Sequence, residues 1–295
     1  MMTSDIVSRA MMTRERTRGT TLLFLPSILL SIVYAVPVTI FRLLTFLELR
    51  QNSAFVEGRL VSSISLTYLG ELGFALLLQL FIGLSCFHLL ELLRGDRQEF
   101  SLKDSFSFLK TEWKKPICTT FLYYYLLLFI AGLPANLGAA LFIKGFTMSS
   151  LMVLSPGAMA ELAVHQPSQL MKIGAPIFLL GMIIYLFVYY TYSQVVFVLY
   201  DHLDNASYTG PLAVFRESRF LMKGNYWQRI WLDLSFLGWF IGELLTLHLL
   251  SFFVTPYYHL SRTIFYEKLK KQRLSAVEWL TVFYDDYREL VLGLK

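Results

Sequence analysis

Charged residues are scarce in this sequence: Asp, Glu, Lys and Arg make up 16% of its 295 residues. A soluble domain usually carries about 25% charged residues, so the composition excludes an ordinary soluble globular protein. Hydrophobic residues reach 56% and aromatic residues 16%, and aromatic side chains are typical of membrane–water interfaces. The apolar runs are continuous and do not alternate, which favours membrane helices over barrel strands. We predict an all-α, polytopic helical membrane protein.

Catalytic and cofactor motifs are also absent. The sequence has no HExxH zinc motif, no Walker phosphate loop, no CxxC pair and no serine in a GxSxG elbow. Cys86 and Cys118 lie in or beside apolar runs, and we expect free thiols. We therefore predict no catalytic residues, no metal and no cofactor. The basic residues lie between apolar runs and form no regular face, so nucleic acid is not an expected partner.

Five hydrophobic runs are long enough to cross a membrane, which takes about 20 apolar residues. We expect a single transmembrane domain over residues 20–266, between a basic cytoplasmic tail (1–19) and an amphipathic C-terminal tail (267–295). The first run is too long for a signal-peptide core and lacks a small-residue cleavage site, so no cleaved signal is expected. The spans lie near residues 21–41, 61–93, 117–143, 174–200 and 231–266.

Basic residues set the expected orientation, because short basic connections stay in the cytoplasm. They are most frequent in the N-terminal tail and in the second and fourth connections, which places the N-terminus in the cytoplasm. Five spans would put the C-terminus outside, yet the residues around Lys270 are also basic. Residues 231–266 are therefore either one span or a broken pair that turns before Pro256. Five and six spans both stay open.

Two cytoplasmic connections have the pattern of amphipathic interfacial helices. In Ser101–Trp113, apolar residues recur at helical spacing. In Pro211–Lys223, apolar and basic residues are interspersed, with Gly210 and Pro211 suited to a helix start and Gly224 to a stop. Recognition of lipids or a partner and simple anchoring are both consistent with this pattern. The predicted interface anchors are Trp113, Lys114, Lys115, Arg219, Lys223, Trp227, Arg229 and Trp231.

Ionisable residues inside the apolar runs are the best candidates for a polar site, because charge in lipid is costly. They are Glu71, Asp233, Glu243 and His248. On one ideal helix Glu243 and His248 would point about 140° apart, so they could meet only if the helix breaks between them. We expect Asp233 to pair with Arg229 or another interfacial cation. A structural role and a proton or cation site are both open.

Two further groups of residues stand out. Gly238 and Gly242 form a GxxxG step, which lets two helices approach closely. We interpret this step as a packing face within the chain, with homodimerisation as the alternative. Asp201, His202 and Asp204 form a weak metal-like cluster at the end of the fourth run. A solvated turn that caps this helix is the preferred interpretation.

Several segments between Tyr192 and Tyr266 resemble the bacterial integral membrane protein family known as domain of unknown function 975. These are YSQVVFVLYD (192–201), SRFLMKG (218–224), LDLSFLGW (232–239), PYY (256–258) and FYEKL (265–269). The resemblance implies a multi-pass protein of the bacterial cytoplasmic membrane. It implies no activity and no catalytic residues.

Two functions are weighed on these grounds. The first is a non-enzymatic protein that binds membrane lipids or membrane-protein partners, as an accessory, receptor-like or envelope-homeostasis factor. The second is a small secondary transporter or permease subunit that uses Glu71, Glu243 and His248. A lipid-modifying enzyme ranks last, and the sequence leaves the ligand, the partner and the oligomeric state undetermined.

Overall fold

The computed structural model describes residues 2–16, 19–51, 56–95, 99–110, 112–154, 166–246 and 248–292. These residues form helices and no β-strand, which confirms the all-α prediction. The elements are α1 (Met2–Arg16), α2 (Thr20–Gln51), α3 (Val56–Arg94), the 3-10 helix η2 (Asp104–Lys110), α4 (Lys114–Leu154), α5 (Gln166–Thr191), α6 (Val195–Asp204), α7 (Pro211–Met222), α8 (Tyr226–Ser235), α9 (Leu237–Leu245) and α10 (Ser251–Leu292).

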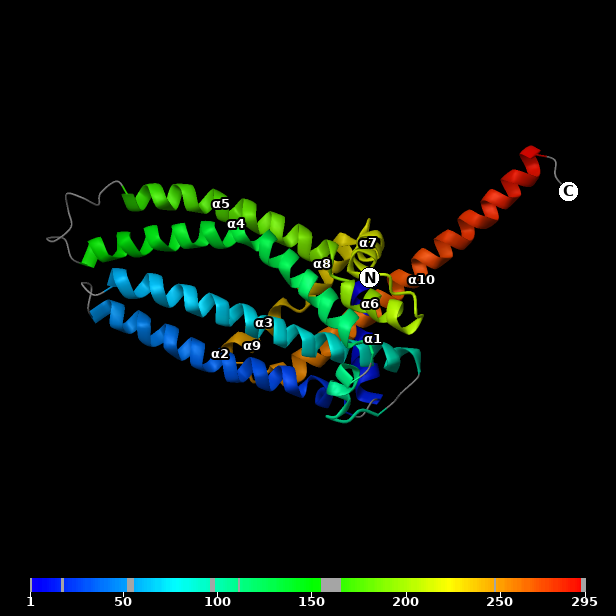
Figure 1. The fold of residues 1–295 in the computed structure, drawn as a ribbon, viewed down its shortest axis with the longest axis horizontal. Helices are drawn as coiled ribbons and strands as arrows, with labels where there is room; N and C mark the ends of the chain where they lie inside the picture. Colours follow the sequence, from blue (N-terminus) through cyan, green and yellow to red (C-terminus); the bar gives the residue numbers. More distant parts are fainter. Residues whose placement is uncertain are drawn as a thin grey trace.

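Two long helical hairpins, α2/α3 and α4/α5, run side by side and define the length of the molecule (Figure 1). At the opposite end from their tips lie α1, α6, α7 and the segment that contains η2 (Figure 1). We call this the polar end, because it carries the connections between α3 and α4 and between α6 and α7. The later part of α10 extends beyond it (Figure 1).

Three helical segments of the described residues are long and apolar enough to cross a membrane: 73–94, 114–146 and 168–204. The five or six spans predicted from the sequence are therefore corrected to three. In α2, the apolar stretch with described side chains is Thr20–Tyr34, which is too short to count as a span. The run 231–266 fails for another reason, because turns divide it into short helices.

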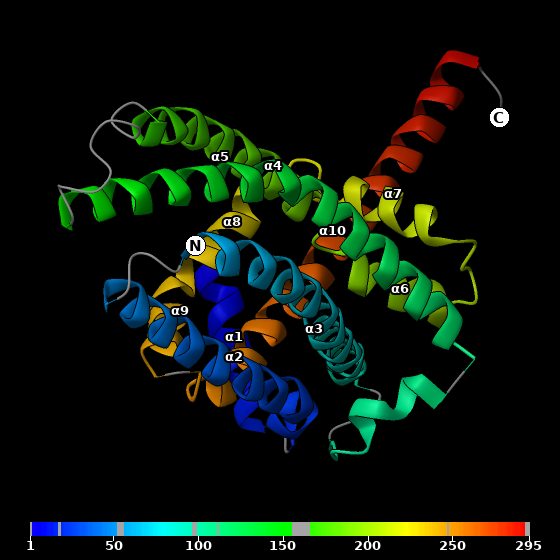
Figure 2. The same cartoon turned by 60° about the vertical axis from the view of Figure 1, so that its left-hand side comes forward.

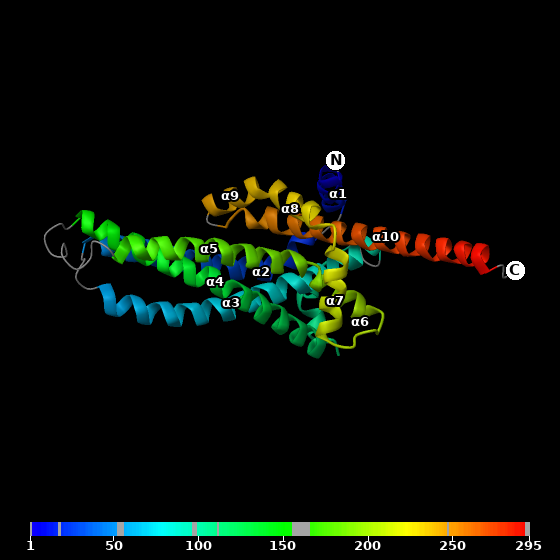
Figure 3. The same ribbon diagram turned by 90° about the horizontal axis from the view of Figure 1, so that it is seen from above.

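The last hydrophobic run folds back on itself. The chain bends at Phe236 between α8 and α9, and α9 ends at Leu245. The backbone N–H of His248 donates to the carbonyl oxygen of Glu243 (2.8 Å), a six-residue closure of the kind that ends helices. The chain then returns through α10, so the run turns before Pro256 as one of the two alternatives expected, although neither arm counts as a span. Figure 3 shows α8 and α9 alongside α10, stopping short of the tips of the α4/α5 hairpin.

The two predicted interfacial helices have different outcomes. Residues 104–110 form a 3-10 helix and not the amphipathic α-helix expected over 101–113. Because a 3-10 helix has three residues per turn, the apolar residues do not line up in the expected stripe. α7 begins at Pro211, and Gly224 just past its end has φ +87°, as the start and stop signals predicted. Its apolar face, including Val214 and Met222, is buried in the protein.

The N-terminal residues expected as a basic tail form α1, which packs on α10 and α8. α1 lies beside the first half of α10 (Figure 2). Ile6 and Ala10 are buried, and the hydroxyl of Tyr257 donates to the carbonyl oxygen of Val7 (3.2 Å). At the other boundary, α10 continues through residue 267, so the expected domain limit at 266/267 falls inside one helix.

Small residues bring α4 and α5 together. A Cβ atom at Gly138 would clash with the backbone of Phe178, and one at Gly181 would clash with the backbone of Ala135. Close approach at small residues is typical of helix pairs in membranes. Most other side chains of this hairpin face outward, including Leu137 and Ile183.

Candidate functional site

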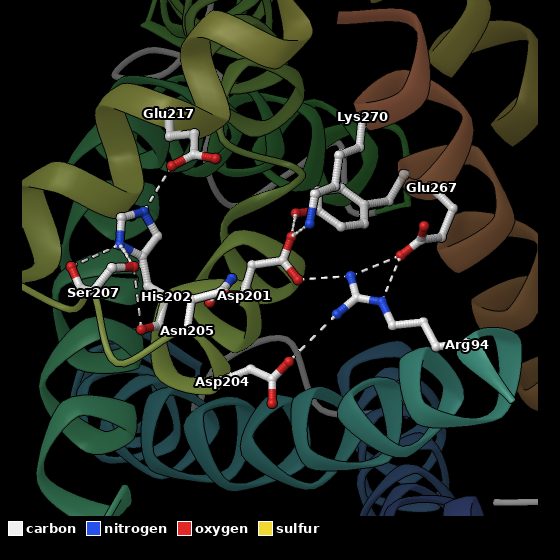
Figure 4. A network of polar contacts seen from close by, with 10 residues as sticks. Arg94, Asp201, His202, Asp204, Asn205, Ser207, Glu217, Glu267 and Lys270 are labelled. Carbon is white, nitrogen blue, oxygen red and sulfur yellow. Dashed lines mark hydrogen bonds and ion pairs between the residues drawn. The ribbon is translucent and has the colours of Figure 1, made fainter. Parts of the chain in front are cut away.

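A network of ion pairs joins α3, α6 and α10 at the polar end (Figure 4). Asp201 ends the apolar part of α6, and its Oδ1 atom accepts from Arg94 Nη2 at 2.6 Å. Its Oδ2 atom accepts from Lys270 Nζ at 2.5 Å and from the hydroxyl of Tyr266 at 2.5 Å. Arg94 Nη2 also bonds Glu267 Oε1 at 2.8 Å. We call Arg94, Asp201, Tyr266, Glu267 and Lys270 the Asp201 junction.

The Asp201 junction borders the largest hydrophobic cluster among the described residues, and its Tyr266 belongs to that cluster. Tyr266 stacks on Phe197 (5.2 Å between ring centroids), and the Arg94 guanidinium lies 5.5 Å from the centroid of the Tyr200 ring. Burial and the adjacent Asp201 carboxylate raise the pKa of Tyr266 well above its ordinary value, so its hydroxyl stays protonated and donates. Buried charges of this kind need complete pairing, and here every charged partner of Asp201 comes from another helix.

The sequence interpretation of 201–205 as a solvated turn is only partly right. Asp201 is buried, whereas Asp204 is exposed and reaches Arg94 at 3.9 Å. His202 Nε2 bonds Glu217 Oε2 of α7 at 2.7 Å (Figure 4). No group of metal-binding residues occurs among the residues that the structure describes. These side chains instead tie α6 to its neighbours.

A second polar cluster lies between α8 and α10. Arg229 is 0% exposed, and its Nη1 atom bonds Asp233 Oδ1 at 2.5 Å, which confirms the expected pair. The hydroxyl of Tyr258 lies 3.1 Å from Arg229 Nη2 and donates to Asp233 Oδ1 at 2.8 Å. Arg229 was predicted as an interface anchor. This is corrected, because its side chain is buried and its carboxylate partner is one turn away on the same helix.

The α9–α10 turn forms a third cluster. Glu243 Oε1 lies 3.3 Å from His248 Nδ1 and also accepts from the hydroxyl of Ser251. The helix breaks between Glu243 and His248 and so brings them together, whereas on one continuous helix they would point about 140° apart. His248 has φ +66°, a left-handed conformation that costs a non-glycine residue free energy. The turn thus holds a carboxylate, an imidazole and a hydroxyl at the tip of a helical hairpin.

The remaining predicted residues fall in different places. Trp113 packs against the main core, whereas Trp227 (73% exposed) and Trp231 (61% exposed) face outward on α8. At Gly238 a Cβ atom would meet open space, and at Gly242 it would lie 3.1 Å from Leu250 Cδ2. The other predicted anchors, Lys114, Lys115, Arg219 and Lys223, are exposed. Glu71 lies in α3, but its side chain is outside the described residues.

Sequence reasoning missed the partners of Asp201. Tyr266 and Lys270 are four residues apart, and such a spacing puts both on one face of a helix. Arg94 and Asp201 each follow a long apolar run. These positions are visible in the sequence, but which apolar runs end beside one another is a property of the fold.

The fold and these clusters define a class: a helical protein with three helices that can cross a membrane, joined by buried ion pairs at the polar end. Within that class, residues 8–273 match the family described as "Protein of unknown function (DUF975)". The chain belongs to this family, and the resemblance inferred from its C-terminal motifs is confirmed. Neither the curated proteins nor the solved structures contain a match to the chain.

Proposed function

We propose that this chain is a non-enzymatic multi-pass protein of the bacterial cytoplasmic membrane that binds membrane lipids or membrane-protein partners. The observation that carries the proposal is the exposure of segment 168–204. Only 11% of its most apolar stretch is buried inside the protein, compared with 44% for segment 73–94. Apolar surface on this scale must be covered by lipid or by another protein.

The charge distribution supports a cytoplasmic polar end. Exposed basic residues lie there at the start of α4 (Lys114 and Lys115) and just past the end of α7 (Lys223), and basic connections stay in the cytoplasm. The outward-facing Trp227 and Trp231 of α8 suit the headgroup level. An accessory, receptor-like or envelope-homeostasis role is consistent with a protein that presents apolar helices to its surroundings.

Copurification in a mild detergent tests this proposal. We expect native mass spectrometry of the purified protein to show retained phospholipid or a membrane-protein partner. A lipid-free monomer without a partner, obtained repeatedly under conditions that preserve folding, would contradict the proposal.

Cysteine labelling in cells that express the protein tests whether the polar end faces the cytoplasm. In a Cys118→Ser background, Ser207→Cys at the polar end should be shielded from a membrane-impermeant maleimide in intact cells. The same residue should react after the cells are opened. Labelling of Ser207→Cys in intact cells would reverse the proposed orientation, and the buried Cys86 serves as the unreactive background.

A small transporter is the second candidate, and the Glu243–His248 contact favours it. An ionisable pair at the tip of a helical hairpin can bind or pass a proton or cation when it lies within the membrane. In sealed proteoliposomes, Glu243→Gln should then abolish proton or cation flux while the protein stays folded. Glu112→Gln, an exposed residue at the polar end, is the matched control. Absence of flux in the unmodified protein across several cations would rule against transport.

A further inference from the structure

Two arginines from different helices meet beside one tyrosine. The guanidinium carbon of Arg229 (α8) lies 5.9 Å from the Tyr258 ring centroid, and that of Arg262 (α10) lies 5.7 Å from the same centroid. Arg262 Nη2 donates to the carbonyl oxygen of Ser193 (2.9 Å), in the turn that separates α5 from α6. The two cations therefore converge where a spanning segment breaks.

Charge is not balanced at this place. Asp233 pairs with Arg229, but Arg262 has no carboxylate within ion-pair distance among the described residues. Both guanidinium groups lie close to the Tyr258 ring, 5.9 Å and 5.7 Å from its centroid, and like charges this near one another repel. Since a buried charge without a counterion is costly, one negative charge is missing from the cluster.

Unused hydrogen-bonding atoms surround the same place. The Nε atoms of Arg229 and Arg262 are buried donors that have no hydrogen-bond partner among the described residues. The buried Gln194 Oε1 is also unpaired among these residues, but it is an acceptor and would need a donor. The Nε2 atom of Gln194 donates to Ser193 Oγ (3.1 Å), so this side chain lies beside the turn that Arg262 contacts. Nearly all buried polar atoms in proteins are paired, and two unpaired guanidinium donors indicate that an acceptor is missing.

We propose that Arg262 and Arg229 form a binding site for a phosphate group, and that the phosphate belongs to the headgroup of an anionic phospholipid. Guanidinium groups bind phosphate oxygens through paired, charge-assisted hydrogen bonds. Arg229 is fully buried, and Arg262 keeps part of its surface exposed although its Nε atom is buried. The phosphate supplies the missing negative charge and the missing acceptors.

The surroundings favour a lipid as the source of the phosphate. Trp227 and Trp231 lie outward on α8, within four residues of Arg229, and tryptophans gather at the headgroup level of membranes. Basic pockets between helices at the cytoplasmic side bind anionic headgroups. The assignment of the phosphate to a lipid headgroup rests on the proposed lipid-binding function. Free inorganic phosphate shares the chemistry and is tested separately.

Thermal unfolding of the full-length protein in an uncharged detergent tests the site. Dioleoylphosphatidylglycerol should raise the midpoint of unfolding, and the zwitterionic dioleoylphosphatidylcholine should not. Arg262→Gln should weaken the apparent affinity for the anionic lipid by about tenfold or more, because charge-assisted hydrogen bonds are lost. Arg216→Gln removes an exposed charge of α7 and should change the affinity by less than about twofold.

A second variant, which is expected to bind the anionic lipid more tightly, keeps the test informative if Arg262→Gln folds poorly. Asp233→Asn removes the carboxylate that competes for Arg229, so it should bind the anionic lipid more tightly and gain a larger rise in unfolding midpoint. A loss of lipid response in Asp233→Asn would overturn the site.

The remaining outcomes separate the site from the function. Stabilisation by inorganic phosphate that disappears in Arg262→Gln would support the anion site and assign free phosphate as its ligand. Undiminished lipid affinity in folded Arg262→Gln would overturn the site and leave the lipid-binding function standing. Failure of the unmodified protein to bind either lipid or phosphate would overturn the site, and failure to retain lipid or a partner in the copurification would overturn the function.

Discussion

In the α4/α5 hairpin, Gly138, Gly174 and Gly181 bring two backbones together, whereas around Asp201 three helices are joined by long charged and aromatic side chains. Only 22% and 11% of the most apolar stretches of the two segments of the hairpin are buried, while the junction buries a carboxylate inside the protein. Backbone proximity and van der Waals contact hold the first region, and matched charge holds the second. Each region should therefore fail by its own route.

The largest loss is expected at the junction. Asp201→Asn leaves Arg94 and Lys270 without their shared carboxylate, and breaking a buried ion pair costs about 3–5 kcal/mol of unfolding free energy. Denaturant or thermal unfolding of the protein in detergent measures this loss. Asp204→Asn, which removes an exposed partner of Arg94, should cost less than about 1 kcal/mol. Equal losses for the two variants would show that the junction is not held by buried charge.

Gly138→Ala tests the hairpin seam. Its new methyl group would press on the backbone of Phe178, and overpacking costs about 1–3 kcal/mol. Gly132→Ala on the same helix is the control, because its nearest neighbour is Tyr185 Cδ2 at 3.5 Å. The control should be neutral or stabilising by up to about 1 kcal/mol, since alanine favours helices. If both substitutions are neutral, the close approach at Gly138 does not hold the hairpin together.

The α9–α10 turn differs from both the junction and the hairpin seam, because it combines a polar contact with a strained backbone. His248→Gly and His248→Ala both remove the imidazole contact with Glu243. Only the alanine keeps a Cβ atom at φ +66°, so we expect His248→Gly to be more stable than His248→Ala by about 1 kcal/mol. The difference between their unfolding free energies measures the backbone strain of alanine, reduced by the greater unfolded-state entropy of glycine. An alanine variant as stable as the glycine variant would show that the turn is not strained.

The smallest effect is expected at the outward face of α8. Trp227→Ala should change the unfolding free energy by less than about 0.5 kcal/mol, as for other exposed positions, although its side chain is as large as any in the protein. Trp113→Ala should lose clearly more, because Trp113 packs against the core 6.1 Å from the Tyr200 ring centroid. A large loss at Trp227 would mean that its exposed face is covered in the folded protein.

Much of the architecture was predictable because it depends on local composition. Length and hydropathy located the spanning segments near 61–93, 117–143 and 174–200, and the structure places candidate spans at 73–94, 114–146 and 168–204. Gly210, Pro211 and Gly224 marked both ends of α7 through their own backbone preferences. The pair of Arg229 and Asp233 was predictable because residues four apart share a helix face.

Other features could not be predicted from composition. Both Asp201 and Arg229 lie in basic or mixed surroundings in the sequence, where a charged residue is ordinarily exposed. Their burial follows from the packing of α10 against α3, α6 and α8. The contact between Glu243 and His248 depends on a turn whose closure involves His248 itself.

The sequence by itself determined the all-α class of this protein, three of its spanning segments and its family, because hydropathy, helix signals and motifs act over short stretches of chain. Only the tertiary structure decided which charges are buried, that the last hydrophobic run turns back, and that Arg229 and Arg262 meet at Tyr258. Burial and charge pairing join residues far apart in the chain, as for Arg94 and Asp201. No local pattern can report which helices will enclose a given side chain.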